Sequence, residues 1–241
     1  MAAPHPPHGA ALGGDGEGQP GPARLRLVEP TVALCESFLE GAAEFYAEGR
    51  PSSTYVPLLG YSLQDLRPSF ARFVAELRAL ASGTSGRAGL AADRVLWLVD
   101  GSEYVGQASV RPQLATEFLF TYGGHIGYSI RPSRRRRGYG TRLLALALPV
   151  ARQLGLRRVL VTCDADNEAS RRIIERNGGR FECALPLPRH VLLLEGRDPA
   201  RPVSKLRFWI DLGELPPALA GAPQQPDSRG GDWPAGWLGS G

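Results

Sequence analysis

The chain has 241 residues, of which 43% are hydrophobic and 22% charged, and its formal net charge is +4 at pH 7. This balance is typical of a soluble globular protein and excludes both a largely disordered chain and one built from membrane-spanning helices. The small excess of basic residues favours anionic ligands but is too low for a dedicated nucleic-acid-binding protein.

The two ends of the chain are rich in glycine, proline and other small or polar residues. Such sequences cannot bury enough apolar surface to offset the entropy lost on ordering, so we expect a disordered arm over 1–22 and a disordered tail over 214–241. Residues 1–22 also lack the basic start and apolar stretch of a secretory signal, which predicts a cytoplasmic location without membrane association. One domain, 23–213, remains between them.

The first half of this domain should contain a strand, two helices and a hairpin. Basic and apolar side chains alternate over 24–29, which predicts a strand, whereas apolar residues recur at helical spacing over 32–42 and 63–80. Two β-type segments, 95–99 and 104–110, flank Asp100-Gly101, a dipeptide typical of two-residue hairpin turns.

The second half alternates strands with helices. Strands are predicted over 125–130 and 159–163, and each is followed by a helix, over 138–154 and 168–177. Three further β-type segments, 180–184, 191–195 and 205–211, would complete the sheet. The whole pattern predicts an α/β domain with a central mixed sheet flanked by helices.

The segment between strand 125–130 and the next helix is rich in glycine and arginine. Gly138 and Gly140 open the helix, directly after four arginines at 134–137. A glycine-containing turn from a strand into a helix leaves backbone N–H groups unpaired, and these act with the helix dipole to bind a phosphate or diphosphate. The arginines add positive charge beside the same anion.

Two simpler interpretations of this segment also exist. A glycine pair after a strand occurs in ordinary strand–helix turns, so the pattern is weak when taken alone. Arginines 134–137 could instead contact a nucleic-acid backbone, although they are confined to one loop without surrounding aromatic residues, which makes nucleic acid an unfavoured partner.

The segment 130–141 resembles the coenzyme A loop of the GNAT superfamily of N-acetyltransferases. Five residues match the strand residue, proline, arginine and two glycines of that loop in register: Ile130, Pro132, Arg135, Gly138 and Gly140. A second segment, 162–179, resembles the next motif of the superfamily, with Asn167 and Ser170 at its polar positions. The sequence of residues 125–133 is especially similar to the corresponding segment in a branch of predicted bacterial acetyltransferases of undefined substrate.

This resemblance implies the GNAT acyl-CoA N-acyltransferase fold, whose sheet is splayed between strands 125–130 and 159–163. It implies acetyl-CoA as the acyl donor, a primary amine as the acceptor, no metal, and a monomer or homodimer. The main chain at Ile130 would hold the pantetheine arm as though it were an extra strand, and Asn167 and Ser170 would contact the arm or the phosphates. The residues implied for the pyrophosphate are Arg135, Arg136, Arg137, Gly138, Tyr139, Gly140 and Thr141. Asn167 also suits a helix cap.

In this superfamily the amine attacks the thioester directly, so no protein nucleophile is required. His125 could accept the proton of the amine, and Glu117 is a carboxylate alternative. Many members carry a tyrosine as general acid where this chain has Ile174. Tyr128, Tyr139 or solvent could replace it, or the reaction could need no general acid. Strand alternation places Tyr128 and His125 on opposite faces.

Two further points follow from the sequence. Cys163 lies at the end of strand 159–163, and we expect an inert buried thiol there; Cys35 and Cys183 have no metal-ligand spacing either. The resemblance also implies that 49–61 and the helix after it border the acceptor cleft. The side chains there or nearby that could cradle a cationic amine are Tyr46, Tyr55, Tyr61, Glu44 and Glu48, although carboxylates on a helix more commonly face solvent. Because the acid tyrosine is missing, the alternative function is a non-catalytic acetyl-CoA sensor.

Overall fold

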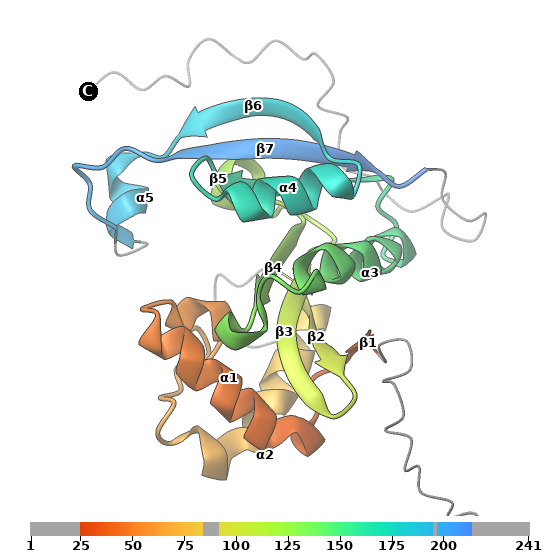
Figure 1. Ribbon diagram of the computed structural model, residues 1–241, viewed down its shortest axis with the longest axis vertical. Coiled ribbons are helices and arrows are strands. Elements are labelled where there is room, and N and C mark those ends of the chain that lie inside the picture. The colour runs from red at the N-terminus through yellow and green to blue at the C-terminus, as the bar shows by residue number, and fades with distance from the viewer. Residues whose placement is uncertain (1–24, 84–91, 195–196, 214–241) are drawn as a thin grey trace, which may run out of the picture.

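Two antiparallel sheets and the helices around them form the part of the chain that the computed structural model describes, residues 25–83, 92–194 and 197–213 (Figure 1). The arm and tail predicted over 1–22 and 214–241 lie outside these residues. Within them, no helix combines the length and apolar character needed to cross a bilayer.

The first sheet has the strand order β1-β2-β3-β4, and every neighbouring pair is antiparallel. The predicted hairpin is confirmed, and its two-residue loop is Gly101-Ser102. The strands of this sheet are β1 (Leu25–Val28), β2 (Arg94–Asp100), β3 (Glu103–Val110) and β4 (Ile126–Ile130).

Helices α1 (Cys35–Ala47) and α2 (Leu66–Ala79) cover one face of this sheet (Figure 1). Helix α1 buries Phe38 and Phe45, which lie seven residues apart and therefore on the same side of the helix. The ring of Phe38 stacks on Trp97 of β2, with 4.7 Å between their centroids. This aromatic core makes α1 a rigid element. The short 3₁₀ turns in this half are Val32–Leu34, Pro51–Thr54 and Leu80–Ser82.

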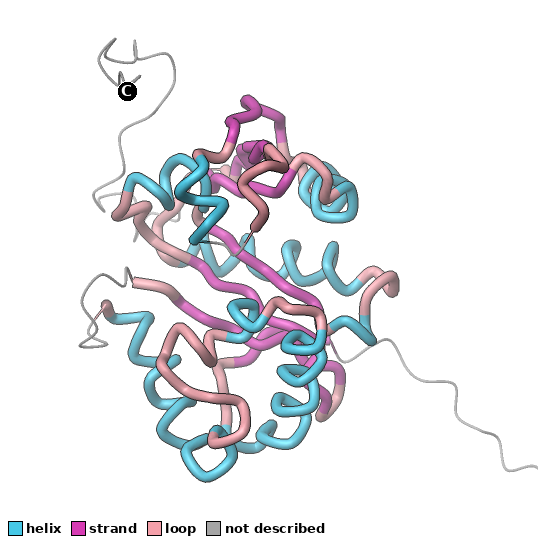
Figure 2. The backbone as a smooth tube through the Cα atoms, turned by 90° about the vertical axis from the view of Figure 1, so that its left-hand side faces the viewer, coloured by secondary structure: helices cyan, strands magenta, loops and turns pink. Residues whose placement is uncertain are grey.

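The opposite face of the sheet packs against α3 (Tyr139–Gln153). Its buried positions Leu143, Ala147 and Ala151 recur every four residues, so they lie on one side of the helix, and the two alanines allow close approach to the sheet. They meet Val105 and Ala108 of β3. The first sheet therefore lies between two helical layers, as Figure 2 shows.

The second sheet has the order β5-β7-β6 and is also antiparallel. Its strands are β5 (Arg158–Asp164), β6 (Arg180–Pro186) and β7 (Ser204–Asp211), and its helices are α4 (Glu168–Arg176) and α5 (Arg189–Leu194). The strand predicted over 191–195 is wrong for the described residues, because 191–194 belong to α5. Val191 and Leu192 pack with Leu187 in a small apolar cluster, and a four-residue apolar run has the same pattern in a short buried helix and in a strand.

The two sheets meet where β4 approaches β5. The one bridge recorded between them in the described residues joins Gly124 to Val161, just before β4 begins. Beyond it the two strands share no ladder, which confirms the predicted splay but divides the predicted single mixed sheet into sheets of four and three strands. The opening therefore has a closed end at Gly124 and an open end at Ile130.

Candidate functional site

One edge of β4 is left unused by strand pairing within the described residues. Arg131 N donates to Val105 O at 2.9 Å and Arg111 N donates to His125 O at 2.8 Å, so the odd-numbered residues of β4 pair with β3. Because pairing alternates in an antiparallel ladder, the main chain of Ile126, Tyr128 and Ile130 faces the splay. The carbonyl of Ile130 accepts Arg135 Nε at 3.1 Å, and its N–H points toward β5.

Gly124 and His125 close the other end of this opening. Gly124 has φ 103° and ψ 175°, a conformation essentially restricted to glycine, and a Cβ there would lie 2.6 Å from Leu160 O. His125 is buried; its N–H donates to Leu160 O at 2.8 Å, and its Nδ1 accepts the Leu160 N–H at 2.9 Å. These contacts hold β4 and β5 together at this end.

The N-terminus of α3 lies directly after the open end. Gly138, the residue before the helix, has φ 78° and provides no side-chain cap. The amides of the first helical turn have no acceptor within an α-helix, and none is found among the described residues for Tyr139, Gly140 and Thr141. Gly140 serves packing, since a Cβ there would lie 2.6 Å from Ile173 Cδ1 on α4. Free amides at the start of a helix are suited to binding an anion, so the anion site predicted here stays a prediction with matching local geometry.

The arginines of the loop divide into two groups. Arg131, Arg134 and Arg135 all bind carboxylates, and Arg135 makes a two-pronged contact to Glu48 at 2.6 and 2.7 Å. Arg136 and Arg137 are exposed, and within the described ranges no carboxylate pairs with either. The Arg135 side chain, expected to add positive charge beside the pyrophosphate, is paired with Glu48, whereas the role implied for its main chain stays a prediction.

Tyr128 crosses the splay from β4 to α4. Its hydroxyl lies 2.7 Å from Ser170 Oγ, so two residues predicted from separate motifs meet here. Burial raises the pKa of Tyr128 well above its ordinary range, and burial raises the pKa of the nearby Cys163 thiol to about 11. Both groups therefore keep their protons at neutral pH, and Cys163 is unsuited to act as a thiolate nucleophile.

Asn167 begins α4 as its N-cap. Its Oδ1 accepts the Ser170 N–H at 3.0 Å, which is the capping role that its residue type allows. Its Nδ2 has no hydrogen-bond partner in the described part of the chain and stays available to a ligand. Ile174, where many GNAT enzymes carry tyrosine, is fully buried.

The opposite face of β4 looks onto the connection between α1 and α2. Ser129 Oγ and Gln107 Nε2 both donate to Ser53 O, at 3.2 and 2.6 Å. Tyr55, in a left-handed backbone conformation with φ 65°, donates to Asp93 Oδ2 at 2.5 Å. These polar groups line the face of β4 opposite Tyr128.

Of the other predicted residues, some lie away from the splay. Glu117 is exposed on the turn before β4, and the Tyr139 hydroxyl donates to Asp100 Oδ2 at 2.7 Å. Glu44 and Glu48 bind loop residues rather than an open acceptor space, so their predicted role as an amine cradle is wrong. Tyr61 donates to Glu76 on α2 at 2.9 Å.

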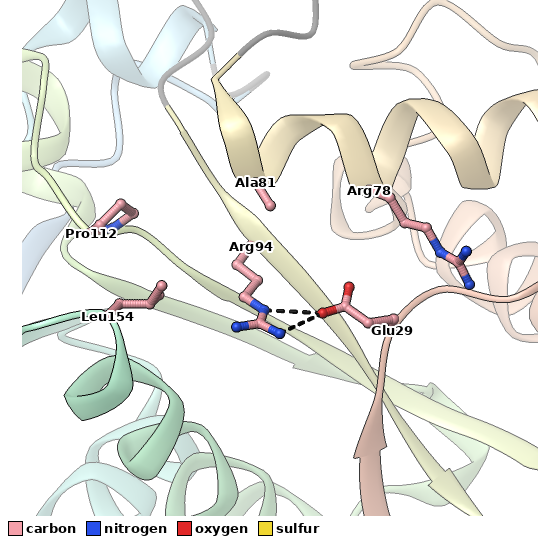
Figure 3. Close-up of a pocket in the computed structure, with 6 residues that line it drawn as sticks. All are labelled: Glu29, Arg78, Ala81, Arg94, Pro112 and Leu154. Carbon is pink, nitrogen blue, oxygen red and sulfur yellow. Dashed lines mark hydrogen bonds and ion pairs between the residues drawn. The ribbon is translucent and has the colours of Figure 1, made fainter.

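A surface depression elsewhere shares no residue with this site. It lies between β2, the end of α2 and the end of α3, and the Arg94–Glu29 ion pair of 2.7 Å spans it (Figure 3). Its lining is Glu29, Arg78, Ala81, Arg94, Pro112 and Leu154. We therefore place the candidate site at the β4–β5 opening, where the unused main-chain groups converge.

Comparison with known protein families assigns this chain to one of them. Residues 24–180 match the acetyltransferase (GNAT) domain model. The chain belongs to the GNAT family. No curated protein sequence matches it.

Solved GNAT acetyltransferases share the fold at low sequence identity. The microcin C7 self-immunity acetyltransferase MccE, in complex with acetyl-CoA and AMP, is 15% identical with a TM-score of 0.53, covering 78% of this chain and 92% of that one. RimL, the ribosomal L7/L12 α-N-protein acetyltransferase in complex with coenzyme A, is 19% identical with a TM-score of 0.51 and the same coverages. An enzyme from Salmonella typhimurium that modifies the N-terminal serine of L7/L12 is 16% identical with a TM-score of 0.50, covering 78% and 94%.

The sequence predicts the loop between β4 and α3 but not the contacts that fix its position. Glu44 of α1 accepts hydrogen bonds from both Ser133 N and Ser133 Oγ, at 2.8 and 2.9 Å. These residues are 89 positions apart, so no local motif links them. The one available signal was the spacing of Glu40, Glu44 and Glu48, which places three carboxylates on one side of a GNAT helix.

Proposed function

We propose that this protein transfers the acetyl group of acetyl-CoA to a primary amine by direct attack in a ternary complex. One observation carries the proposal: the unused edge of β4 leads directly into the uncapped N-terminus of α3. The donor has matching chemistry, an extended amide-containing arm that ends in a diphosphate. MccE and RimL, which share the fold, were solved with acetyl-CoA and coenzyme A.

The closed end of the opening supports a position for the thioester beside Tyr128. An arm that starts at the diphosphate site and follows β4 from Ile130 must end before the Gly124–Val161 bridge. The reactive carbonyl then lies beside Tyr128, and a main-chain N–H of β4 can donate to its oxygen. The acceptor would approach from the side of Ser129 and Tyr55.

The reaction needs one proton removed and one supplied. The amine nitrogen forms a bond to the thioester carbon, the carbon–sulfur bond breaks, the nitrogen loses a proton and the sulfur gains one. The general base that removes the amine proton is still a prediction. His125 accepts the Leu160 N–H at Nδ1, so its own proton lies on Nε2, and this favours a structural role for the ring, whereas Glu117 is exposed on the turn before β4.

We propose that the Tyr128 hydroxyl donates a hydrogen bond to the departing sulfur. Its raised pKa suits donation of a hydrogen bond to the thiolate more than full proton transfer, since the phenol then holds its proton more tightly than a thiol does. A hydrogen bond to a charged group contributes about 1.5–3 kcal/mol, so Tyr128→Phe should lower kcat roughly 10- to 100-fold. Steady-state kinetics at saturating acetyl-CoA would measure this effect.

Two controls accompany this variant. Tyr61→Phe also removes a tyrosine hydroxyl, but that hydroxyl binds Glu76 on α2, away from the splay, so kcat should stay within about twofold. Calorimetry should give Tyr128→Phe a Kd for acetyl-CoA close to that of the wild type. An unchanged kcat in Tyr128→Phe would exclude the tyrosine from the chemical step.

The test of the function itself is release of coenzyme A thiol from acetyl-CoA in the presence of amines. The panel would include peptide N-termini, lysine-containing peptides, polyamines and small amines, with acetylated product identified by mass spectrometry. Turnover with one class establishes the transferase and its acceptor. Acetyl-CoA binding without turnover on any amine would instead support the sensor, the alternative that buried Ile174 raises.

A further inference from the structure

Three carboxylates on one side of α1 face the start of the loop between β4 and α3. Glu40, Glu44 and Glu48 are spaced four residues apart, so they form a row along the helix. The other side of α1 is anchored in the aromatic core through Phe38, which is fully buried and stacks on Trp97. The row is therefore carried on a rigid element that does not belong to the loop itself.

Glu44 makes the densest set of contacts in this row. Its Oε2 accepts Ser133 N–H at 2.8 Å, and its Oε1 accepts Ser133 Oγ at 2.9 Å and Arg131 Nε at 2.6 Å. Burial acts against its charge, but the bonds from Ser133 and Arg131 outweigh this and hold the pKa of Glu44 below its usual value. The carboxylate is therefore ionised throughout the neutral range.

The contacts around Glu44 help to hold the Arg131 side chain in one orientation. The Arg131 side chain is 9% exposed and also reaches Glu40 and Glu103, each at 3.3 Å. A buried guanidinium with three carboxylate partners has little freedom to reorient. Both ends of the short turn from Arg131 to Ser133 are thus tied to α1.

This turn determines where the donor-binding amides lie. Three residues after Ser133, Arg136 adopts a left-handed conformation with φ 61°, which is uncommon for a residue other than glycine, and Gly138 follows with φ 78°. Two left-handed residues so close together need external support to persist. The contacts of Glu44 provide it on the strand side of the loop.

We propose that Glu44 is a positioning residue for the acyl donor, which fixes the loop so that its amides and the α3 N-terminus meet the diphosphate. The inference rests on the proposed function, because it concerns how the same site holds acetyl-CoA. It adds a residue outside the loop, on a helix 89 positions earlier in the chain.

If Glu44 acts only through its charge, removing the carboxylate should lower the Kd for acetyl-CoA, whereas a positioning role predicts a higher Kd. Acetyl-CoA is an anion, so removing a carboxylate near its site should strengthen binding if electrostatics alone matters. Glu48→Gln tests that effect, because Glu48 neutralises Arg135 without bonding to the loop backbone. Glu44→Gln removes the same charge but also an acceptor for Ser133 N–H.

The experiment is calorimetric titration of the full chain with acetyl-CoA. We expect Glu44→Gln to raise the Kd roughly tenfold, since a charge-assisted contact is lost, and Glu48→Gln to leave it equal or lower it. Glu36→Gln is the matched control, because Glu36 lies on the same helix and pairs with Arg67 on α2, away from the loop. Its Kd should stay within about twofold of the wild type.

Ser133→Ala gives a milder variant in case Glu44→Gln does not fold, as judged by urea unfolding. It removes one exposed hydroxyl contact and should raise the Kd roughly threefold. Wild-type binding with a Kd unchanged or lowered in Glu44→Gln and unchanged in Ser133→Ala would overturn the positioning role alone. Absence of wild-type binding would overturn the proposed function instead.

Discussion

Gly138→Asp should weaken acetyl-CoA binding at least about 100-fold, because a fixed negative charge would then lie at the entrance to α3 beside the bound diphosphate. No atom lies within 4 Å of a Cβ built at Gly138, so the side chain has room and the fold should tolerate it. Aspartate also accepts left-handed backbone conformations better than most residues, which suits φ 78°. Calorimetric titration with acetyl-CoA measures the loss directly.

Gly138→Asn is the matched control for this substitution. Asparagine has nearly the same shape as aspartate and the same tolerance of a left-handed backbone, but it is neutral. We expect its Kd to lie within about threefold of the wild-type value. Equal affinities for the two variants would mean that the diphosphate does not bind at the N-terminus of α3.

A second large effect is expected at the closed end of the splay. Gly124→Ala should lower the free energy of unfolding by about 3 kcal/mol or more, since the backbone conformation at φ 103° and ψ 175° is essentially restricted to glycine. The added Cβ would also lie 2.6 Å from Leu160 O, so β4 and β5 must separate where they are bridged. Urea denaturation would measure the loss, and we expect weaker acetyl-CoA binding with it.

Gly101→Ala separates backbone strain from the clash. Gly101 has φ 63° in the β2–β3 hairpin, and a Cβ at this position would meet no atom within 4 Å, so only conformational strain should follow, about 1 kcal/mol. If Gly124→Ala cost no more than Gly101→Ala, the close approach of the two strands at Gly124 would be contradicted.

The parts of the site that could be predicted from sequence are those encoded by local chemistry. Gly138 and Gly140 were recognised as the opening of α3, although they serve different needs: Gly138 adopts φ 78°, and Gly140 leaves room for Ile173. Strand alternation puts neighbouring residues on opposite faces, and in the structure Tyr128 and Ser129 of β4 indeed reach in opposite directions, toward α4 and toward Ser53. Period-two alternation needs no tertiary information.

The partners of the arginines could not be predicted in the same way. Four consecutive arginines look equivalent in the sequence, yet Arg134 and Arg135 find carboxylates on β3 and at the end of α1, while Arg136 and Arg137 have none among the described residues. Which charge is neutralised depends on contacts between segments more than 30 residues apart. Such contacts follow from packing rather than from local pattern.

The helix over 191–194 shows that a short apolar run does not distinguish a helix from a strand. The sequence Val-Leu-Leu-Leu has strong β character but is too short for its period to separate helix from strand. In the structure β6 pairs directly with β7, and residues 189–194 between them form α5, which contributes Val191 and Leu192 to the apolar cluster with Leu187. Tertiary packing decided the outcome.

The most direct test of the account is amide hydrogen exchange along β4, followed by NMR with and without acetyl-CoA. If the donor arm pairs with the unused edge, the amides of Tyr128 and Ile130 should exchange at least about tenfold more slowly in the complex, whereas those of Gly127 and Ser129, already paired with β3, should change little. Acetyl-CoA binding without this alternating protection would contradict the placement of the donor between β4 and β5.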